Sequence, residues 1–352
     1  MTDVTVMGAG VFGLASAYAM ARRGARVRVI DPAGTGAGAS GGVVGALSPH
    51  VPENWNAKKA FQLESLLMSG DWWDGVAAAS GLDTGYARTG RLQPLADAAA
   101  AELARARGGA AARLWRGRAE WRVVPARSGG WAVESPSGLC VHDTLSARIA
   151  PRRAVAALSA AVWALGGEVR RDCEGRGAVL WATGAEGLAG MSRDFGRVLG
   201  APVKGQAALL GHDAGGSPQI FAGALHVVPH ADGTVAVGST SEASFRAGTE
   251  TDSALDTLIG RARSLVPALE RAEVVARWAG VRARAVTRAP VLGAWPGRPG
   301  HFVANGGFKI GFGLAPLVGE VMADLILEGR DGIPGEFTVE ACLGQARPLA
   351  GD

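Results

Sequence analysis

Cysteine is scarce in this chain: its 352 residues include only Cys140, Cys173 and Cys342. The three lie far apart, and no two of them form a C-x-x-C pair. Structural zinc sites and disulfide frameworks need closely spaced cysteines or an even set of them. The sequence therefore predicts neither kind of site, and we expect no metal among the cofactors.

Long apolar runs and dense basic stripes are missing as well. The longest apolar window covers residues 11–21, far short of the roughly 20 residues that a membrane-spanning helix needs. The formal net charge is only +4, and no basic stripe is interleaved with aromatic residues, as nucleic-acid binding would favour. No leader-like segment precedes the first apolar strand. We therefore expect a cytoplasmic protein with no membrane span and no nucleic-acid partner.

The most specific pattern lies within residues 4–32. An apolar strand leads into a G-x-G-x-x-G loop formed by Gly8, Gly10 and Gly13. A helical segment follows, Gly24 ends it, and a second apolar strand leads to Asp31. This is a βαβ unit with an acidic residue about 20 residues beyond the glycines, the arrangement typical of dinucleotide binding.

Each of these residues has a physical role in that interpretation. Gly8 permits the tight turn, Gly10 lets the backbone approach a pyrophosphate, and Gly13 lets the helix pack closely on the strand. The helix N-terminus offers free N–H groups and the positive end of its dipole to the phosphates. Asp31 can accept hydrogen bonds from a ribose diol and would repel a 2′-phosphate, which argues against NADP. The segment therefore predicts an adenine dinucleotide site.

The rest of the chain predicts a mixture of helices and short strands. A loop of small residues at 33–45 either brings further N–H groups to the pyrophosphate or is a flexible surface loop. Periodicity predicts helices at 57–79, from 151 to about 165, at 253–265 and at 314–327. It predicts strands at 91–95, 121–124, 131–134, 168–170, 178–181 and 274–282, with a meander between 205 and 240.

Several segments, in this order, resemble one family along nearly the whole chain. They are Gly8–Gly13 with Asp31, Ala39-Ser40, Thr89–Leu92, Ile149–Pro151, Trp181–Gly184, Val227–Pro229 with Val237–Thr240, Trp278–Arg282 and Asn305–Gly311. The pattern is similar to that of the D-amino-acid oxidase, glycine oxidase and sarcosine oxidase family of FAD-dependent oxidoreductases. No single motif is decisive, but the order and spacing of so many of them are.

The resemblance implies an α/β fold with a Rossmann-like, glutathione-reductase-type FAD-binding domain and a second, mostly antiparallel β-sheet domain for the substrate. It places residues 1–75, 143–200 and 300–345 in the discontinuous FAD-binding domain. The substrate-binding domain would then comprise residues 76–142 and 201–299.

The resemblance also implies a cofactor, a reaction and site residues. The cofactor is non-covalent FAD, and the reaction is oxidation of a C–N bond in an amino acid or N-methyl amino acid, with hydride transfer to flavin N5. The implied catalytic residues are Arg282, which would hold the substrate carboxylate, Lys309 near the flavin, and His226 facing the substrate. The implied cofactor-binding residues are Gly8, Ala9, Gly10, Val11, Phe12, Gly13, Asp31, Pro32, Ala39, Ser40, Ala182, Thr183, Gly184, Gly306, Gly307, Phe308, Lys309, Ile310 and Gly311.

The chain departs from the family pattern at several positions of the site. His226 occupies the strand that often carries an active-site tyrosine, and the two tyrosines of the chain, Tyr18 and Tyr86, lie elsewhere. Residues 283–286 replace the proline and aspartate that usually follow the arginine, and Ile310 stands where a histidine is common. No cysteine lies near the arginine, which disfavours a covalent flavin.

Other interpretations remain open at this point. The chain could be a flavoprotein subunit of a larger amine dehydrogenase, or a partner-dependent flavoenzyme of tRNA or thiazole metabolism. An NAD-dependent dehydrogenase would use the first βαβ unit alone, and a flavin-binding module without catalysis is compatible as well. Structural roles are open too: Arg282 in a surface ion pair, Lys309 extending to solvent, and His226 as a core histidine.

Overall fold

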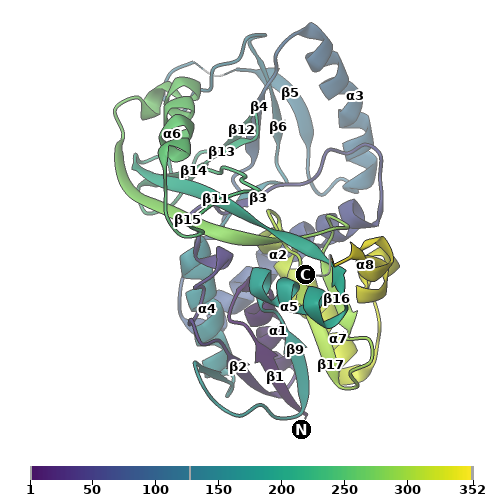
Figure 1. The fold of residues 1–352 in the computed structure, drawn as a ribbon. Coiled ribbons are helices and arrows are strands. Elements are labelled where there is room, and N and C mark those ends of the chain that lie inside the picture. The colour runs from purple at the N-terminus through teal and green to yellow at the C-terminus, as the bar shows by residue number, and fades with distance from the viewer. Residues whose placement is uncertain (1, 127, 350–352) are drawn as a thin grey trace.

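The computed structural model describes residues 2–126 and 128–349, and its two large β-sheets form the lower and upper halves of the molecule in Figure 1. The sheet of the lower half has the strand order β16-β17-β9-β1-β2-β8. Its strands are β1 (Asp3–Met7), β2 (Arg26–Ile30), β8 (Glu168–Arg170), β9 (Ala178–Trp181), β16 (Val291–Ala294) and β17 (His301–Asn305). All neighbours in this sheet are parallel except β16, which runs antiparallel to β17.

The sheet of the upper half has the order β15-β11-β14-β13-β12-β4-β6-β5 and is antiparallel except between β12 and β4. Its strands are β4 (Arg91–Pro94), β5 (Trp121–Pro125), β6 (Leu139–Asp143), β11 (Gly200–Gly211), β12 (Gln219–Ala222), β13 (Leu225–Pro229), β14 (Thr234–Gly238) and β15 (Glu273–Ala285). Two short pairs complete the strands: β3 (Ala46–Leu47) with β7 (Ala147–Arg148), and β10 (Arg197–Val198) with β18 (Arg347–Pro348).

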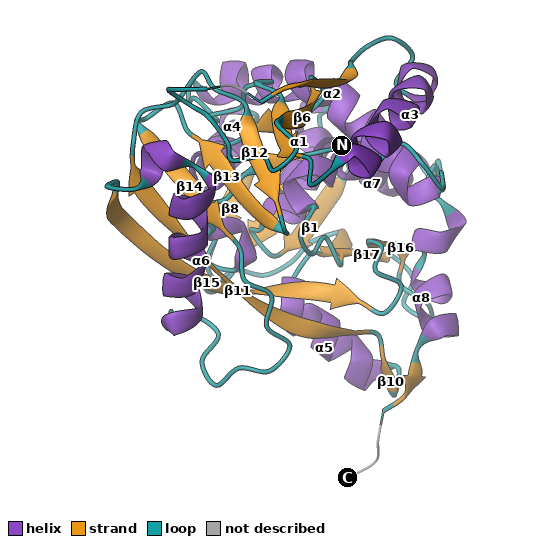
Figure 2. Cartoon of the chain, turned by 90° about the horizontal axis from the view of Figure 1, so that it is seen from above, coloured by secondary structure: helices purple, strands orange, loops and turns teal. Residues whose placement is uncertain are grey.

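The helices divide between the two sheets. They are α1 (Val11–Arg22), α2 (Ala57–Ser80), α3 (Ala98–Leu114), α4 (Pro151–Ala164), α5 (Gly184–Asp194), α6 (Ser253–Leu265), α7 (Gly311–Glu328) and α8 (Val339–Gln345). Helices α1, α2, α4 and α7 pack on one another, whereas α5 lies beside β11 and β15, as Figure 2 shows from above. Within the described residues, no helix combines the length and apolar character that a membrane crossing would require.

The apolar core is continuous around α1. Residues 11–21 of this helix are all buried, because α4 and α7 pack against it and the parallel sheet lies next to it. Glycine allows the closest of these contacts: a Cβ at Gly319 of α7 would lie 2.8 Å from the carbonyl oxygen of Ala15. Trp72 and Trp73 of α2 are almost completely buried, at 3% and 0% exposure. Both side chains are part of the apolar core.

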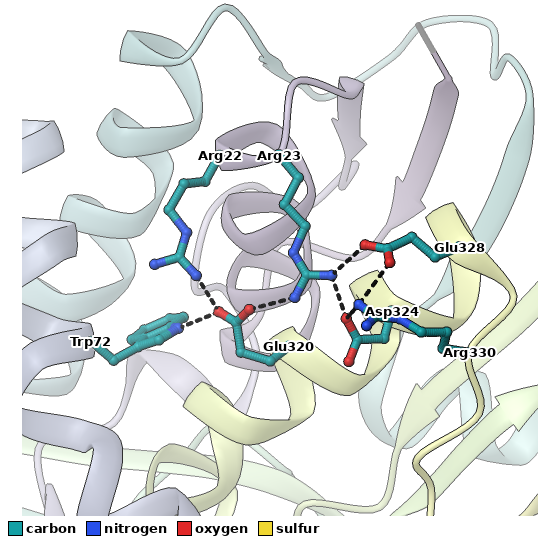
Figure 3. Close-up of polar contacts among 7 residues, drawn as sticks. All are labelled: Arg22, Arg23, Trp72, Glu320, Asp324, Glu328 and Arg330. Atoms are coloured by element: carbon teal, nitrogen blue, oxygen red, sulfur yellow. Dashed lines mark hydrogen bonds and ion pairs between the residues drawn. The ribbon is translucent and has the colours of Figure 1, made fainter.

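A cluster of charged residues joins the C-terminal end of α1 to α7 (Figure 3). The carboxylate of Glu320 accepts hydrogen bonds from Arg22 and Arg23, both at 2.7 Å. The indole N–H of Trp72 donates to the same carboxylate at 3.0 Å. The side chain of Glu320 is only 16% exposed, so this cluster ties three helices together at a poorly solvated point.

Most of the elements expected from periodicity are present, and two expectations are wrong. Residues 131–134 do not form a strand: Trp131 instead donates its indole N–H to Pro218 and stacks on His212. Strand β16 belongs to the parallel sheet, although the expected boundary at residue 300 placed it in the substrate domain. Its backbone pairs antiparallel with that of β17, and a local pattern does not reveal this pairing. The remaining domain boundaries stay a prediction.

Candidate active site

One cavity of about 620 Å³ lies between the two sheets and is lined by residues from both. Strands β1, β2, β9 and β17 all end at its wall, so it lies outside the carboxyl edge of the parallel sheet. Ligands of open α/β folds bind in this crevice, because the loops that follow parallel strands converge there. The strands β11, β13 and β15 of the second sheet close the opposite side.

The glycine-rich loop has the geometry that its sequence predicts. Gly8 has a φ of +107°, and a Cβ there would lie 2.4 Å from the carbonyl oxygen of Ala182. A Cβ at Gly13 would lie 2.0 Å from the carbonyl oxygen of Gly8. A side chain at Gly8 would clash with the backbone at Ala182, and one at Gly13 would clash with the carbonyl of Gly8. These contacts confirm the tight turn and the close packing of the helix on the strand.

Three helix N-termini open into the cavity without a side-chain cap. They belong to α1, α5 and α7, whose N-cap residues are Gly10, Thr183 and Ile310. Each brings backbone N–H groups and the positive end of a helix dipole, which favour an anionic ligand. The first N–H of α1, that of Val11, donates to the hydroxyl of Ser40 at 3.0 Å, which draws the small-residue loop against this helix end. This donor set fits a pyrophosphate and an electron-rich ring.

Asp31 is held by the loops on either side of it. Its Oδ2 accepts the N–H of Ala9 at 2.8 Å, and its Oδ1 accepts the N–H of Ala33 at 3.0 Å. A carboxylate has about four acceptor positions, so lone pairs remain for the hydroxyls of a ribose. The side chain lines the cavity, where the predicted role requires it.

The cavity wall includes most of the expected cofactor residues. Those that line it are Gly10, Val11, Phe12, Asp31, Ala39, Ser40, Ala182, Thr183, Gly184, Gly306, Gly307, Phe308, Lys309 and Gly311. Those outside the wall are Gly8, Ala9, Gly13, Pro32 and Ile310, of which the two glycines shape the loop from behind. Taken together, the glycine cradle, the uncapped helix ends and the cavity volume fit FAD.

Arg282 of β15 is buried at the wall of the cavity, with 8% exposure. Its guanidinium donates to the hydroxyl of Ser239 at 2.7 Å and to the carbonyl of Thr240 at 3.2 Å. Within the described residues, no carboxylate lies within ion-pair distance of it. Burial lowers the pKa of Arg282 to about 10, against an opposing effect of Glu242. The side chain is thus a buried cation whose remaining N–H groups are available to an anion.

Lys309 is a second cation at the cavity, on the loop between β17 and α7. It is exposed at the edge of the cavity, and its Nζ lies 5.7 Å from the ring centre of Phe308. The guanidinium of Arg284 lies 5.9 Å from the same ring. Partial burial lowers the pKa of Lys309, and the positive charges of Arg282 and Arg284 lower it further. No carboxylate of the described chain forms an ion pair with Lys309.

His226 of β13 lines the cavity beside Phe221, with ring centres 4.6 Å apart. Its Nδ1 is buried and has no hydrogen-bond partner in the described part of the chain. Burial lowers the pKa of His226 to about 3, and the charges of Arg91 and Lys309 add to this effect. The imidazole is therefore neutral near pH 7. A group with this pKa is a weak base at that pH, so the geometry favours an orienting hydrogen bond over proton abstraction.

One lining residue could not be found from the sequence. Thr249 comes from an irregular loop and belongs to none of the segments that carry the family resemblance. His50 and Asn56 lie outside the cavity wall. The backbone N–H of His50 donates to Gln62, and Asn56 caps α2 by accepting the N–H of Lys59 at 3.0 Å. Among the described residues, no cluster could hold a metal ion.

The fold and the cavity together define a flavin-dependent oxidoreductase. The family model for FAD-dependent oxidoreductases matches residues 3–325 of this chain, and the chain belongs to that family. FAD is accordingly its cofactor.

Two glycine oxidases are similar to the chain over more than nine tenths of their length. The chain is 30% identical over 361 residues to a glycine oxidase of Pseudomonas aeruginosa, covering 94% of this chain and 96% of that protein. It is 28% identical over 359 residues to a glycine oxidase of Geobacillus kaustophilus, covering 92% of each chain.

Solved structures show the same fold. The crystal structure of the glycine oxidase from Geobacillus kaustophilus superposes with a TM-score of 0.81 at 23% identity, over 96% of this chain and 98% of that one. An iminodiacetate oxidase from Chelativorans sp. BNC1 superposes with a TM-score of 0.80 at 21% identity, over 95% and 98%. At these identities the likeness concerns the fold alone.

Proposed function

We propose that this protein oxidises the C–N bond of a small amino acid or N-methyl amino acid. Bound FAD would supply the hydride acceptor, its N5 atom, for the hydrogen on the substrate α-carbon. The single observation that carries this proposal is Arg282, a buried cation at the cavity with no carboxylate partner in the described chain. Burying a charge without a partner is costly, so a partner of opposite charge is expected from the substrate.

Arg282 would bind the carboxylate of the substrate. A planar guanidinium presents parallel N–H donors that match the two oxygens of a carboxylate. The hydroxyl of Ser239 and the carbonyl of Thr240 occupy other donors and hold the group in one orientation. The substrate would therefore be fixed at one end, which limits the positions that its α-carbon can take.

The charges around the cavity would also favour a neutral substrate amine. The acidic residues in its wall are Asp31 and Glu186, which follow β2 and β9 on the nucleotide side. Arg282 and Lys309 supply positive charge on the other side. Positive charges nearby disfavour an ammonium ion and lower its pKa. A neutral amine is the form from which hydride loss is favourable, because its lone pair stabilises the developing iminium.

His226 and Lys309 would complete the site. We assign His226 the role of orienting the substrate through a neutral imidazole, in place of the tyrosine that the family often uses. We assign Lys309 the role of a positive charge beside the ring system, where it would stabilise negative charge that develops there. The names of the glycine oxidase relatives support a small amino-acid substrate.

A partner-dependent role in thiazole metabolism is the alternative. The chain is 26% identical over 359 residues to a bifunctional ThiO/ThiG protein of Nostoc, covering 93% of this chain but 53% of that protein. In such a setting the oxidation could be the same, and its product would pass to a second protein. Co-purification with another polypeptide, together with no turnover of free amino acids, would favour this alternative.

Anaerobic reduction of the flavin tests the proposal directly. The purified holoenzyme would be mixed with glycine, sarcosine, proline and a set of D-amino acids, and the visible absorbance of its oxidised flavin followed. We expect at least one of these compounds to bleach the flavin. The same mixtures in air, with peroxide detection, would identify oxygen as the acceptor. Protein without flavin absorbance, or flavin that no compound reduces, would contradict the proposal.

A further inference from the structure

The loop from Ser239 to Asp252, between β14 and α6, is tied at both ends to one stretch of β11. Gln206 of β11 is completely buried. Its Nε2 donates to Glu242 at 3.0 Å and to Asp252 at 2.8 Å, and its Oε1 accepts the N–H of Asp252 at 2.8 Å. One amide therefore fixes an early and a late residue of the loop.

Lys204, two residues earlier on β11, pairs with the same two acids. It is 3% exposed, and its Nζ lies 3.0 Å from Asp252 Oδ2 and 3.6 Å from Glu242 Oε2. The hydroxyl of Thr240 also hydrogen-bonds Glu242. Hydrogen bonds from Gln206 and Lys204 lower the pKa of Asp252 to about 2. The hydrogen bond to Asp252 and the negative charges of Glu242 and Asp252 raise the pKa of Lys204. Asp252 is thus held as an anion against Lys204, and the carboxylate of Glu242 lies on the same ammonium group.

This cluster lies directly behind Arg282. Thr240, which binds Glu242 through its hydroxyl, accepts a hydrogen bond from Arg282 through its carbonyl. Glu242 is near enough for its charge to raise the pKa of Arg282, yet it forms no ion pair with that guanidinium. An unrestrained glutamate at this position would be attracted to Arg282 and would compete with an incoming carboxylate.

We propose that Lys204 is a positioning residue that holds Glu242 away from Arg282 and so leaves the guanidinium free for the substrate carboxylate. The proposal rests on the proposed function, because it takes Arg282 as the group that binds this carboxylate. Lys204 acts through Glu242 and does not line the cavity. The same restraint shapes the cavity wall, since Thr249 of the tied loop is part of that wall.

The test uses holoenzyme variants and acetate as a carboxylate probe, with its Kd taken from the change in flavin absorbance. Lys204→Gln removes the charge but keeps hydrogen-bond donors toward both acids. We expect it to raise the Kd for acetate at least tenfold, and the KM for the amino acid that bleaches the flavin fastest by a similar factor. The kcat should stay within threefold. Lys204→Arg, which keeps the charge, should stay within threefold of the wild type in both constants.

The double variant Lys204→Gln/Glu242→Gln decides between positioning and a merely structural role. If Glu242 is the competitor, removing its charge restores the Kd to within threefold of the wild type. A double variant as weak as Lys204→Gln, or a Lys204→Gln variant that binds acetate normally, overturns the proposal. Thr240→Val releases Glu242 from its other side and provides a second route if Lys204→Gln does not fold. We expect it to weaken acetate binding about threefold or more, again reversed by Glu242→Gln.

Arg282→Ala separates this inference from the proposed function. If that variant binds acetate as the wild type does, the carboxylate role of Arg282 fails and the inference fails with it. If it binds acetate weakly while Lys204→Gln binds normally, the proposed function stands and only the role of Lys204 is wrong.

Discussion

The guanidinium of Arg282 lies over the α-carbon of Gly205. A Cβ at Gly205 would lie 2.1 Å from both terminal nitrogens of Arg282, although the two residues belong to different strands. In the register of β11 and β15, Gly205 pairs with Gly280, and Arg282 pairs with Val203. Gly205 thus leaves the space that the guanidinium occupies, whereas a Cβ at Gly280 would lie 2.4 Å from the ring of Trp278.

Gly205→Ala should therefore impair carboxylate binding without unfolding the protein. The added methyl meets the flexible end of Arg282, which can move aside at little cost in stability. The displaced guanidinium would then be misaligned, and we expect the KM for an amino-acid substrate to rise at least tenfold. Gly216→Ala, where a Cβ meets nothing within 4 Å, is the matched control. A normal KM for Gly205→Ala would show that the position of the guanidinium is unimportant.

Arg282→Ala should raise the KM for a carboxylate substrate at least tenfold. A charge-assisted hydrogen bond contributes about 1.5–3 kcal/mol, and about 1.4 kcal/mol corresponds to a factor of ten. Arg277→Ala removes an exposed arginine of the same strand, which pairs with Asp256, and should leave steady-state kinetics unchanged. Equal KM values for the two variants would reject the carboxylate role.

His226 should make the protein less stable in acid. Its pKa is about 3 in the folded state, against 6.5 as the ordinary value. Between these two pH values the unfolded chain binds a proton that the folded chain does not, so stability falls as the pH drops below 6.5. The loss is at most about 1.4 kcal/mol per pH unit. The Tm of His226→Gln, followed from pH 7.5 to 4.5, should fall less than that of the wild type; parallel curves would contradict this.

Gly13→Ala should abolish FAD retention. Its Cβ would lie 2.0 Å from the backbone oxygen of Gly8, and backbone cannot move aside as a side chain can. The turn and the N-terminus of α1 would separate, and both face the pyrophosphate in our interpretation. The ratio of flavin to protein absorbance after purification measures the loss. Gly70→Ala, in open space on α2, should keep the wild-type ratio, and a flavin-loaded Gly13→Ala would contradict the assigned cradle.

Glu320→Ala should lower the Tm without changing kinetics. Its carboxylate binds Arg22, Arg23 and Trp72 (Figure 3). Its removal breaks two ion pairs and takes away the acceptor of the indole N–H of Trp72, a residue that is 3% exposed. We expect a cost of about 1–3 kcal/mol, which lowers the Tm by about 1–2 °C for each kcal/mol in a chain of 352 residues. Asp194→Ala breaks an exposed pair with Arg298 and should cost less than about 1 kcal/mol. Similar shifts for both variants would mean that Glu320 contributes no more than a surface pair.

The glycine-rich turn of the candidate cofactor site was predictable from the sequence, because its determinants are local. A tight turn at Gly8 and close packing at Gly13 follow from residues within one βαβ unit. The helix at 253–265 was also predicted with its observed bounds, because a capping residue and a periodic apolar face are both local signals. Strand β16 and residues 131–134 were misjudged, because pairing partners far along the chain decided their structure.

The sequence by itself determined the nucleotide-binding unit, the family resemblance and the identity of the candidate residues. Only the tertiary structure decided how the charges among them are distributed. It buried Arg282 with no carboxylate partner among the residues that the structure describes, placed Glu242 against Lys204, and enclosed His226 where its imidazole stays neutral. The physical reason is that burial and distance set the strength of electrostatic interactions. Both depend on strands and loops that are distant in the sequence and adjacent in space.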